Sequence, residues 1–275
     1  MIELFEYQFF VMALVAVVLI SVSAAIIGTY ILTRRLVAIS GGVTHACFGG
    51  LGLGYYLGIN PIVPAAGFAI ASSMAVEWMS RRLNLREDSA IAVIWALGMA
   101  IGVVFVFITP GYVPELTSFL FGNILTISAA DLWAFAVYTV VLVAFMCWRY
   151  RQIVVCAFDR DFAAVSGLPV RFITYTMTVL IAVGIVLTIR LVGVMLLMSM
   201  LSLPMMTAEV FTRRYRSMMV VSVVVSLVCS VAGLLIGAQA DVPCSAFIVL
   251  LMAAAFIGAK LLRRINKQGL TNQTN

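Results

Sequence analysis

The only histidine of the chain, His45, lies in an apolar, glycine-rich segment that runs from Ala38 to Gly54. An ionisable side chain is costly in a bilayer and usually faces the protein interior or a wet cavity. A neutral imidazole is also a good ligand for transition-metal ions. These two properties predict that His45 lies on a pathway through the membrane and contacts a metal ion there.

A metal site built on a single histidine needs ligands of other types or from a second subunit. Cys47 is close in sequence, but residues two apart point about 200° away from each other on a helix, so His45 and Cys47 cannot chelate one ion. Gly41, one turn before His45, offers no side chain. The distant carboxylates of Glu77 and Glu209 each precede a pair of arginines. Ion pairing with those arginines is the simpler explanation of both.

No sequence motif of an enzyme is present. The chain has no phosphate-binding GxxxxGK[ST], no HExxH zinc motif and no nucleophile elbow. We therefore expect neither catalysis nor a permanently bound cofactor.

The composition is that of a membrane protein with many spans. Of the residues, 64% are hydrophobic and 10% are charged, whereas soluble domains average about 25% charged residues. We predict an all-α transmembrane bundle that forms one domain over residues 1–275. Nine spans are expected, at 9–33, 37–58, 61–80, 88–108, 130–148, 170–189, 192–212, 217–238 and 243–263.

The positive charges fix the predicted orientation. All of the 17 Lys and Arg residues except Arg190 fall in alternate loops or at the C-terminal end. The positive-inside rule then places the N-terminus outside and the C-terminus, with a tail over 264–275, in the cytoplasm. This arrangement also explains the net charge of +6 without nucleic acid. The outer side carries acidic residues that would attract cations, namely Glu3, Glu6, Glu115, Asp131 and Asp241.

Two spans contain residues that disturb a regular helix. The second is rich in glycine, including Gly41, Gly49 and the series Gly50, Gly54 and Gly58. Glycines let helices approach closely, and they can also expose backbone to a pathway. In the seventh span, Pro204 removes a backbone donor, which favours either a broken helix at a substrate site or a simple kink. Hydroxyl groups of Ser199, Ser202 and Thr207 could satisfy the freed backbone.

Two shorter segments are also expected to be helical. Residues 119–127 are too few to span and predict a half-helix on the outer side, before an N-cap at Ser128. In the cytoplasmic segment 158–168, Asp159 suits an N-cap and Gly167 suits the C-terminal cap. Phe158, Phe162 and Val165 would then form an apolar stripe. Because so short a helix is unstable alone, the stripe must dock on its own protein or on a cytoplasmic partner.

The order of several stretches resembles the membrane permeases of ATP-binding-cassette importers for zinc, manganese or ferrous iron. The likeness covers residues 10–262. It rests on Ser40 to Ala46 with the histidine in register, and on 57–61, 85–91, 120–125, 157–168 with Pro169, and 192–204. The resemblance implies a fold similar to the vitamin B12 and siderophore importers. It also implies a homodimer, cytoplasmic ATP-hydrolysing subunits, an extracytoplasmic metal-binding protein and a bacterial cytoplasmic membrane.

The resemblance also assigns roles to single residues. The segment 158–168 would be the coupling helix that contacts the ATPase subunits, and His45 would contact the ion with Thr44 adding an oxygen. The family usually has an aspartate where this chain has Gly41, and often a proline where it has Gly49. Without that carboxylate, Glu209 or Glu77 could contribute after a helix movement.

We therefore predict a permease that moves a divalent transition-metal ion into the cytoplasm, with zinc, manganese and iron all possible. Three alternatives stay open. The same architecture could import a metal chelate such as haem or a siderophore, the chain could be an ATP-independent channel or secondary transporter, or it could be a membrane scaffold.

Overall fold

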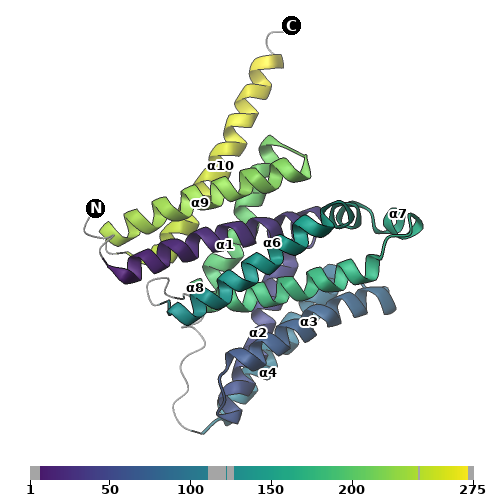
Figure 1. Cartoon of the computed structure of the whole chain (residues 1–275), viewed down its shortest axis with the longest axis vertical. Coiled ribbons are helices and arrows are strands. Elements are labelled where there is room, and N and C mark those ends of the chain that lie inside the picture. Colours follow the sequence, from purple (N-terminus) through teal and green to yellow (C-terminus); the bar gives the residue numbers. More distant parts are fainter. Residues whose placement is uncertain (1–6, 111–121, 123–126, 241, 272–275) are drawn as a thin grey trace.

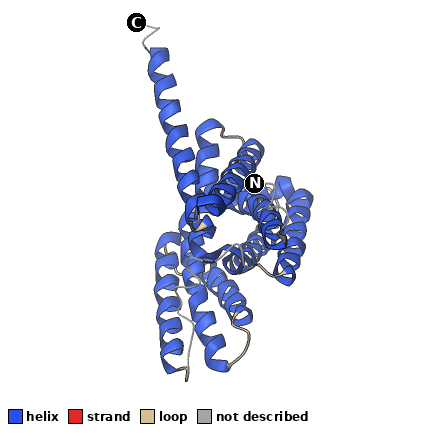
Figure 2. Ribbon diagram, turned by 90° about the vertical axis from the view of Figure 1, so that its left-hand side faces the viewer, coloured by secondary structure: helices blue, strands red, loops and turns tan. Residues whose placement is uncertain are grey.

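The computed structural model of the chain describes residues 7–110, 122, 127–240 and 242–265, together with the backbone of 266–271. In this part of the chain the regular structure is helical, without strands (Figure 2). The helices are α1 (Gln8–Thr33), α2 (Val37–Leu57), α3 (Ile62–Arg82), α4 (Glu87–Ile108), α6 (Ala129–Phe158), α7 (Arg160–Val165), α8 (Val170–Phe211), α9 (Tyr215–Ala240) and α10 (Cys244–Thr271). Within the described residues, 8 helices are long and apolar enough to cross a membrane. The all-α, multi-pass prediction is confirmed.

Helix α8 accounts for two of the predicted spans. Its 42 residues correspond to about 63 Å of helix, roughly twice the hydrocarbon thickness of a bilayer. Gly193 interrupts it with φ 81° and ψ 169°, a conformation that is essentially restricted to glycine. The break falls just after Arg190, where the sequence predicts the turn between spans six and seven. Gly122 packs directly against the backbone of this break.

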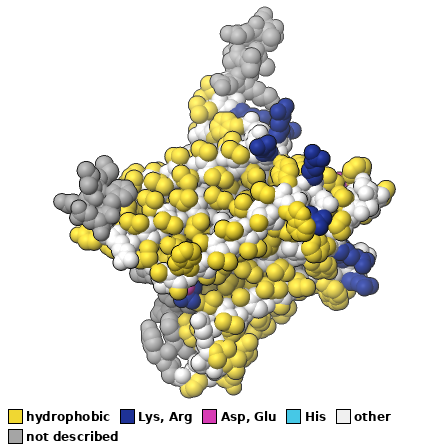
Figure 3. Space-filling view, in the orientation of Figure 1, with side chains coloured by type: hydrophobic (Ala, Val, Ile, Leu, Met, Phe, Trp, Pro, Cys, Tyr) yellow, Lys and Arg dark blue, Asp and Glu magenta, His cyan; other side chains and the backbone are white. Residues whose placement is uncertain are grey.

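The helices form two groups in the fold. Helix α2 packs closely against α3 and α4, and we call these three helices the α2–α4 unit. Helix α1 packs on α6, α8 and α9, while α10 packs on α8 and α9 (Figure 1). Lys and Arg side chains gather on the side of the molecule where α7 lies, and most of the remaining visible surface is hydrophobic (Figure 3). This distribution matches the predicted cytoplasmic side.

Glycines make the close packing of α2 possible. A methyl group added at Gly50 would lie 2.6 Å from the Cα atom of Ala65 on α3, and one at Gly52 would lie 2.6 Å from the carbonyl oxygen of Gly102 on α4. Gly54 meets Pro61 in the same way. The predicted glycine face is therefore a packing face. Gly58 does not belong to it, because it ends α2 as a C-cap with φ 65°.

Some predicted boundaries are wrong or lie outside the described residues. Helix α6 continues past 148 to Phe158, with a non-helical residue at Arg149. Helix α10 runs on to Thr271, through much of the expected tail. Of the predicted half-helix at 119–127, only residues 122 and 127 are described. The acidic residues Glu3, Glu6, Glu115 and Asp241 also lie outside the described residues.

Candidate transport site and cytoplasmic surface

His45 lies on α2, partly exposed, and its ring orientation is fixed from two sides. Its Nδ1 atom is 2.8 Å from the carbonyl oxygen of Gly41. Because a carbonyl can only accept, Nδ1 is the donor of this hydrogen bond, and in a neutral imidazole Nε2 then keeps its lone pair. The ring stacks on Trp95 of α4, with centroids 4.5 Å apart and an interplanar angle of 26°. A hydrogen bond from one ring nitrogen to a backbone carbonyl is how proteins orient a histidine that ligates metal through its other nitrogen.

The neighbours of His45 do not complete a metal site. Thr44 is fully buried and donates its hydroxyl hydrogen bond to the carbonyl of Ser40, so in this conformation it points into the packed interior. Cys47 is also buried and bonds to the carbonyl of Val43, as expected from its place on the helix. No group of three or more His, Cys, Asp and Glu side chains suited to a metal ion occurs among the described residues.

A thioether side chain covers the position where the family usually has a carboxylate. A methyl group added at Gly41 would lie 3.1 Å from the Cε atom of Met198 on α8. The space beside His45 is therefore bounded by a soft, uncharged group instead of a hard anionic oxygen.

Gly49 and Pro204 have a structural place in the fold. Gly49 is packed between Phe68 of α3 and Gly98 of α4, and an added methyl group would lie 2.7 Å from the Phe68 ring. Its role as pathway backbone stays a prediction. Pro204 is buried inside a helical part of α8, and the break in that helix lies at Gly193 instead. Of the two alternatives predicted for Pro204, the broken helix is therefore excluded.

The hydroxyl groups near Pro204 do not compensate for its missing amide. Pro204 leaves the carbonyl of Met200 without its usual helical donor. The three side chains instead bond four residues back along α8, Ser199 to Met195, Ser202 to Met198 and Thr207 to Leu203. Such back-bonding is a common use of Ser and Thr in membrane helices.

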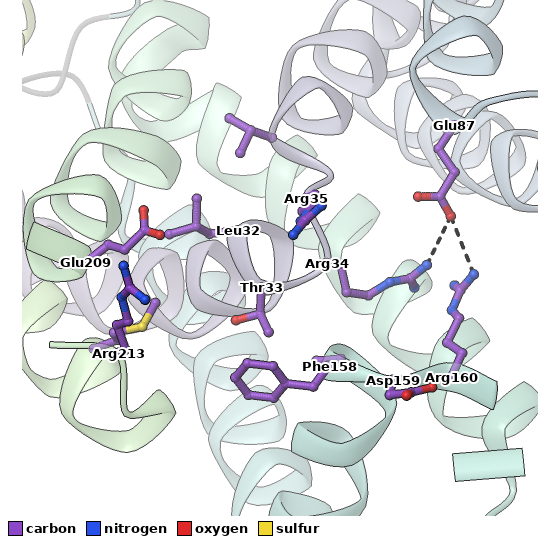
Figure 4. A pocket seen from close by; sticks show the side chains of 13 residues that line it. Leu32, Thr33, Arg34, Arg35, Glu87, Phe158, Asp159, Arg160, Glu209 and Arg213 are labelled. Carbon is purple, nitrogen blue, oxygen red and sulfur yellow. Dashed lines mark hydrogen bonds and ion pairs between the residues drawn. The ribbon is translucent and has the colours of Figure 1, made fainter. Parts of the chain in front are cut away.

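Glu209 lies at the cytoplasmic end of α8, away from His45. It lines a cavity of about 950 Å³ together with Arg213, Arg35 and Val37 (Figure 4). Val37 begins α2, and His45 lies about 12 Å further along that helix. The structure therefore does not bring Glu209 and His45 together. Glu209 also forms no ion pair with the side chains that the structure describes, although the sequence predicts one.

Helix α7 has the predicted caps. The Asp159 carboxylate accepts a hydrogen bond of 2.9 Å from the amide of Phe162. At the other end Gly167 has φ 74°, and the amides of Gly167 and Leu168 bond back to the carbonyls of Ala164 and Ala163. This pattern is a Schellman motif.

The apolar stripe of the segment 158–168 is divided between two helices. Phe162 and Val165 lie on α7 and are 63% and 90% exposed. Phe158 is the last residue of α6, because Asp159 is extended, and its ring meets Tyr215 edge-on at 6.3 Å. Phe158 therefore does not lie on α7 itself, but it is 62% exposed. Its predicted part in the docking stripe stays a prediction, and Phe162 and Val165 form a small exposed surface on α7 on which a partner could dock.

An ionic cluster lies next to α7 at the cytoplasmic ends of several helices. Glu77 of α3 is 2.6 Å from Arg81, 2.8 Å from Arg160 and 3.8 Å from Arg34. Glu87, the first residue of α4, is 3.2 Å from Arg34 and 3.4 Å from Arg160. Figure 4 shows both arginines pointing toward Glu87 from different helices. We call these five residues the cytoplasmic cluster.

Arg34 stays charged in the cluster although it is buried. Burial acts to lower the pKa of its guanidinium group, but the Tyr30 hydroxyl, Glu77 and Glu87 outweigh this and raise the pKa above its usual value. The sequence predicts the pair of Glu77 with Arg81, because residues four apart are neighbours on a helix. The contacts with Arg34 and Arg160 join distant segments, and no local signal indicates them.

The sequence pattern described as the ABC 3 transport family matches residues 6–263. The chain belongs to this family. A member of similar sequence, "Probable metal transport system membrane protein" of Chlamydia pneumoniae, is 32% identical over 89% of this chain and 85% of its own length. The "Manganese transport system membrane protein MntC" of Listeria monocytogenes is 26% identical over 97% and 94%.

A solved structure of similar fold supports the family assignment. It is described as PsaBC from Streptococcus pneumoniae in complex with Fab, and it matches with a TM-score of 0.81 and 25% identity. The match covers 94% of this chain and 95% of the other. This member of the ABC 3 transport family is a multi-pass membrane protein.

Proposed function

We propose that the chain is the permease subunit of an ATP-binding-cassette importer that moves a divalent transition-metal ion into the cytoplasm. The observation that carries this proposal is the orientation of His45. In a chain of the ABC 3 transport family, the only imidazole is held by Gly41 and Trp95 with Nε2 free to bind a metal ion. Relatives named for metal and manganese transport support the class of cargo.

The other parts of the assembly follow from the same proposal. Cytoplasmic subunits would hydrolyse ATP and dock on the surface formed by Phe162 and Val165, so the chain itself would not be an enzyme. A second copy of the chain and an extracytoplasmic metal-binding protein would complete the pathway. The described residues of one chain contain no three-ligand cluster for a metal ion. A second copy would supply a second His45 as a further ligand.

The mechanism uses His45 as a weak, transient ligand. One imidazole nitrogen binds a divalent ion without holding it permanently, as transport requires. Docking of ATP-loaded subunits on α7 would then shift the helices and release the ion inward. Gly41 supplies no carboxylate, and Met198 adds a soft neighbour. We therefore expect the site to prefer softer ions over manganese more strongly than a site with a carboxylate would.

The test is ATP-dependent uptake of Mn²⁺, Zn²⁺ and Fe²⁺ into liposomes that contain the complete complex. His45→Ala should lower uptake about tenfold or more, the range seen when a metal-site residue is lost. Cys47→Ala is the matched control, because Cys47 is buried and bonded within α2. Equal uptake by wild type and His45→Ala would remove His45 from the pathway. Uptake without ATP would instead favour a channel or secondary transporter.

A further inference from the structure

The two functional regions of the molecule lie on different groups of helices. His45 and Trp95 belong to the α2–α4 unit, whereas the exposed side chains Phe162 and Val165 belong to α7. The backbone of α7 packs on α6 and α8. Helix α8, which follows α7 in the chain, also packs on α2 and α3, so one route from α7 to the α2–α4 unit runs through the packing of α8.

Arg160 makes a second connection, which runs from α7 to the α2–α4 unit without α8. It is the first residue of α7, and its Nη2 atom lies 2.8 Å and 3.0 Å from the two carboxylate oxygens of Glu77 on α3. Its Nη1 atom lies 3.4 Å from Glu87 at the start of α4. One side chain of α7 thus contacts both α3 and α4, and Figure 4 shows the contact with Glu87.

The contact of Arg160 with Glu77 is the better shielded of the two, because Glu77 is 6% exposed whereas Glu87 is 28% and Arg160 itself 27% exposed. Glu77 and Arg34 are only 6% and 5% exposed, so solvent and salt screen their interactions much less than those of surface pairs. The Nε atom of Arg160 is buried and has no acceptor among the described residues. Buried donors normally have partners, and the cluster therefore has one unused donor that a second arrangement of its carboxylates could satisfy.

We infer that Arg160 is a positioning residue for transport, which passes a displacement of α7 to α3 and α4 and so to His45. This inference rests on the proposed function, because it takes α7 as the docking site of the ATP-hydrolysing subunits. It adds that an ionic contact made by one side chain acts beside the packing of α8 on α2 and α3.

The experiment compares metal ions transported per ATP hydrolysed, in liposomes that contain the complete complex with Mn²⁺ or Zn²⁺ as cargo. Arg160→Gln should keep ATP hydrolysis and lower the transported ions per ATP about tenfold, the size of a typical coupling between two sites. Arg160→Lys keeps the charge and should restore part of the ratio. Arg171→Gln is the control, because Arg171 is exposed in the first turn of α8 and should behave as wild type.

The outcomes separate this inference from the proposed function. An unchanged ratio in Arg160→Gln would overturn the role of Arg160 while metal transport by the wild type still stands. Equal loss of complex assembly in Arg160→Gln and Arg160→Lys would make the residue merely structural and would also overturn it. A second variant, Glu87→Gln, removes only the contact with α4 and should lower the ratio less than Arg160→Gln. Failure of the wild type to move any metal would reject the proposed function itself.

Discussion

The α2–α4 unit is held together in two different ways along its length. Within the membrane, glycines bring the backbones of α2, α3 and α4 into direct contact, and no side chain separates them at Gly50 or Gly52. At the cytoplasmic end, the carboxylates of Glu77 on α3 and Glu87 on α4 bind the guanidinium groups of Arg34, which caps α1, and Arg160 of α7. Packed backbones have little freedom to slide, whereas ion pairs can exchange partners. The membrane part of the unit is therefore held by rigid packing, and its cytoplasmic end by contacts that can rearrange, which is what the inferred role of Arg160 needs.

Removing the central carboxylate of the cytoplasmic cluster should have the largest effect. Glu77→Gln leaves the buried Arg34 and two further arginines without their shared partner. Breaking a buried pair in this way typically costs about 3–5 kcal/mol. We expect a clear loss of thermal stability of the purified chain in detergent. Size-exclusion chromatography after heating would measure this loss. Asp88→Asn is the control, since Asp88 is exposed in the same region, and an equal loss in both variants would contradict the importance of the cluster.

A methyl group in the glycine contact should have the next largest effect. Gly50→Ala places a Cβ atom 2.6 Å from the Cα atom and 2.7 Å from the amide nitrogen of Ala65. Both are backbone atoms that cannot move aside, and overpacking costs about 1–3 kcal/mol. Thermal unfolding in detergent would measure the loss.

Gly67→Ala is the matched control for the glycine contact. Gly67 lies on the neighbouring helix α3 with open space around it, so alanine should stabilise that helix by up to about 1 kcal/mol. If the two substitutions changed stability in the same direction, close backbone packing would not be what holds α2 in place.

The sequence predicts the helices well because long apolar runs and the placement of arginines are both visible in one dimension. The caps at Ser128, Asp159 and Gly167 are also predictable, since each depends on residues within three or four positions. The place of the break in α8 is also predicted, by the turn between spans six and seven, but the residue that makes it is Gly193, although Pro204 carries the stronger local signal. A proline fits a helix when its neighbours allow it, but a positive φ is visible only in the structure.

The candidate site is less predictable for a related reason. His45 stands out in the sequence, yet its contacts with Trp95 and the nearness of Met198 to Gly41 depend on how α2, α4 and α8 meet. The contact between Arg160 and Glu77 joins residues far apart in the chain. Without an account of helix packing, the sequence indicates only that both are charged residues near the cytoplasm.

The cap of α7 should have a smaller and local effect. Asp159→Ala removes the acceptor for the Phe162 amide and should cost about 1 kcal/mol of helix stability. Because α7 has only 6 residues, its first turn should fray and expose the peptide bond after Arg160. Faster cleavage there by trypsin would measure this. Asp161→Ala changes a neighbouring acidic residue that is not the cap, and equal cleavage rates in the two variants would argue against the capping role.

The smallest effect is expected at the outer side, where a single ion pair offers a contrast with the cytoplasmic cluster. Arg190 lies 2.7 Å from Asp131, and their side chains are 38% and 20% exposed. Exposed pairs contribute about 0–1 kcal/mol and are screened by salt. Arg190→Gln should therefore lower thermal stability slightly at low salt, and the difference from wild type should disappear at about 1 M salt. The loss caused by Glu77→Gln should largely persist under the same conditions, because that carboxylate is only 6% exposed and buried pairs are screened much less. If salt removed both losses alike, the two regions would be electrostatically equivalent, and burial of Glu77 would not distinguish the cytoplasmic cluster from the outer ion pair.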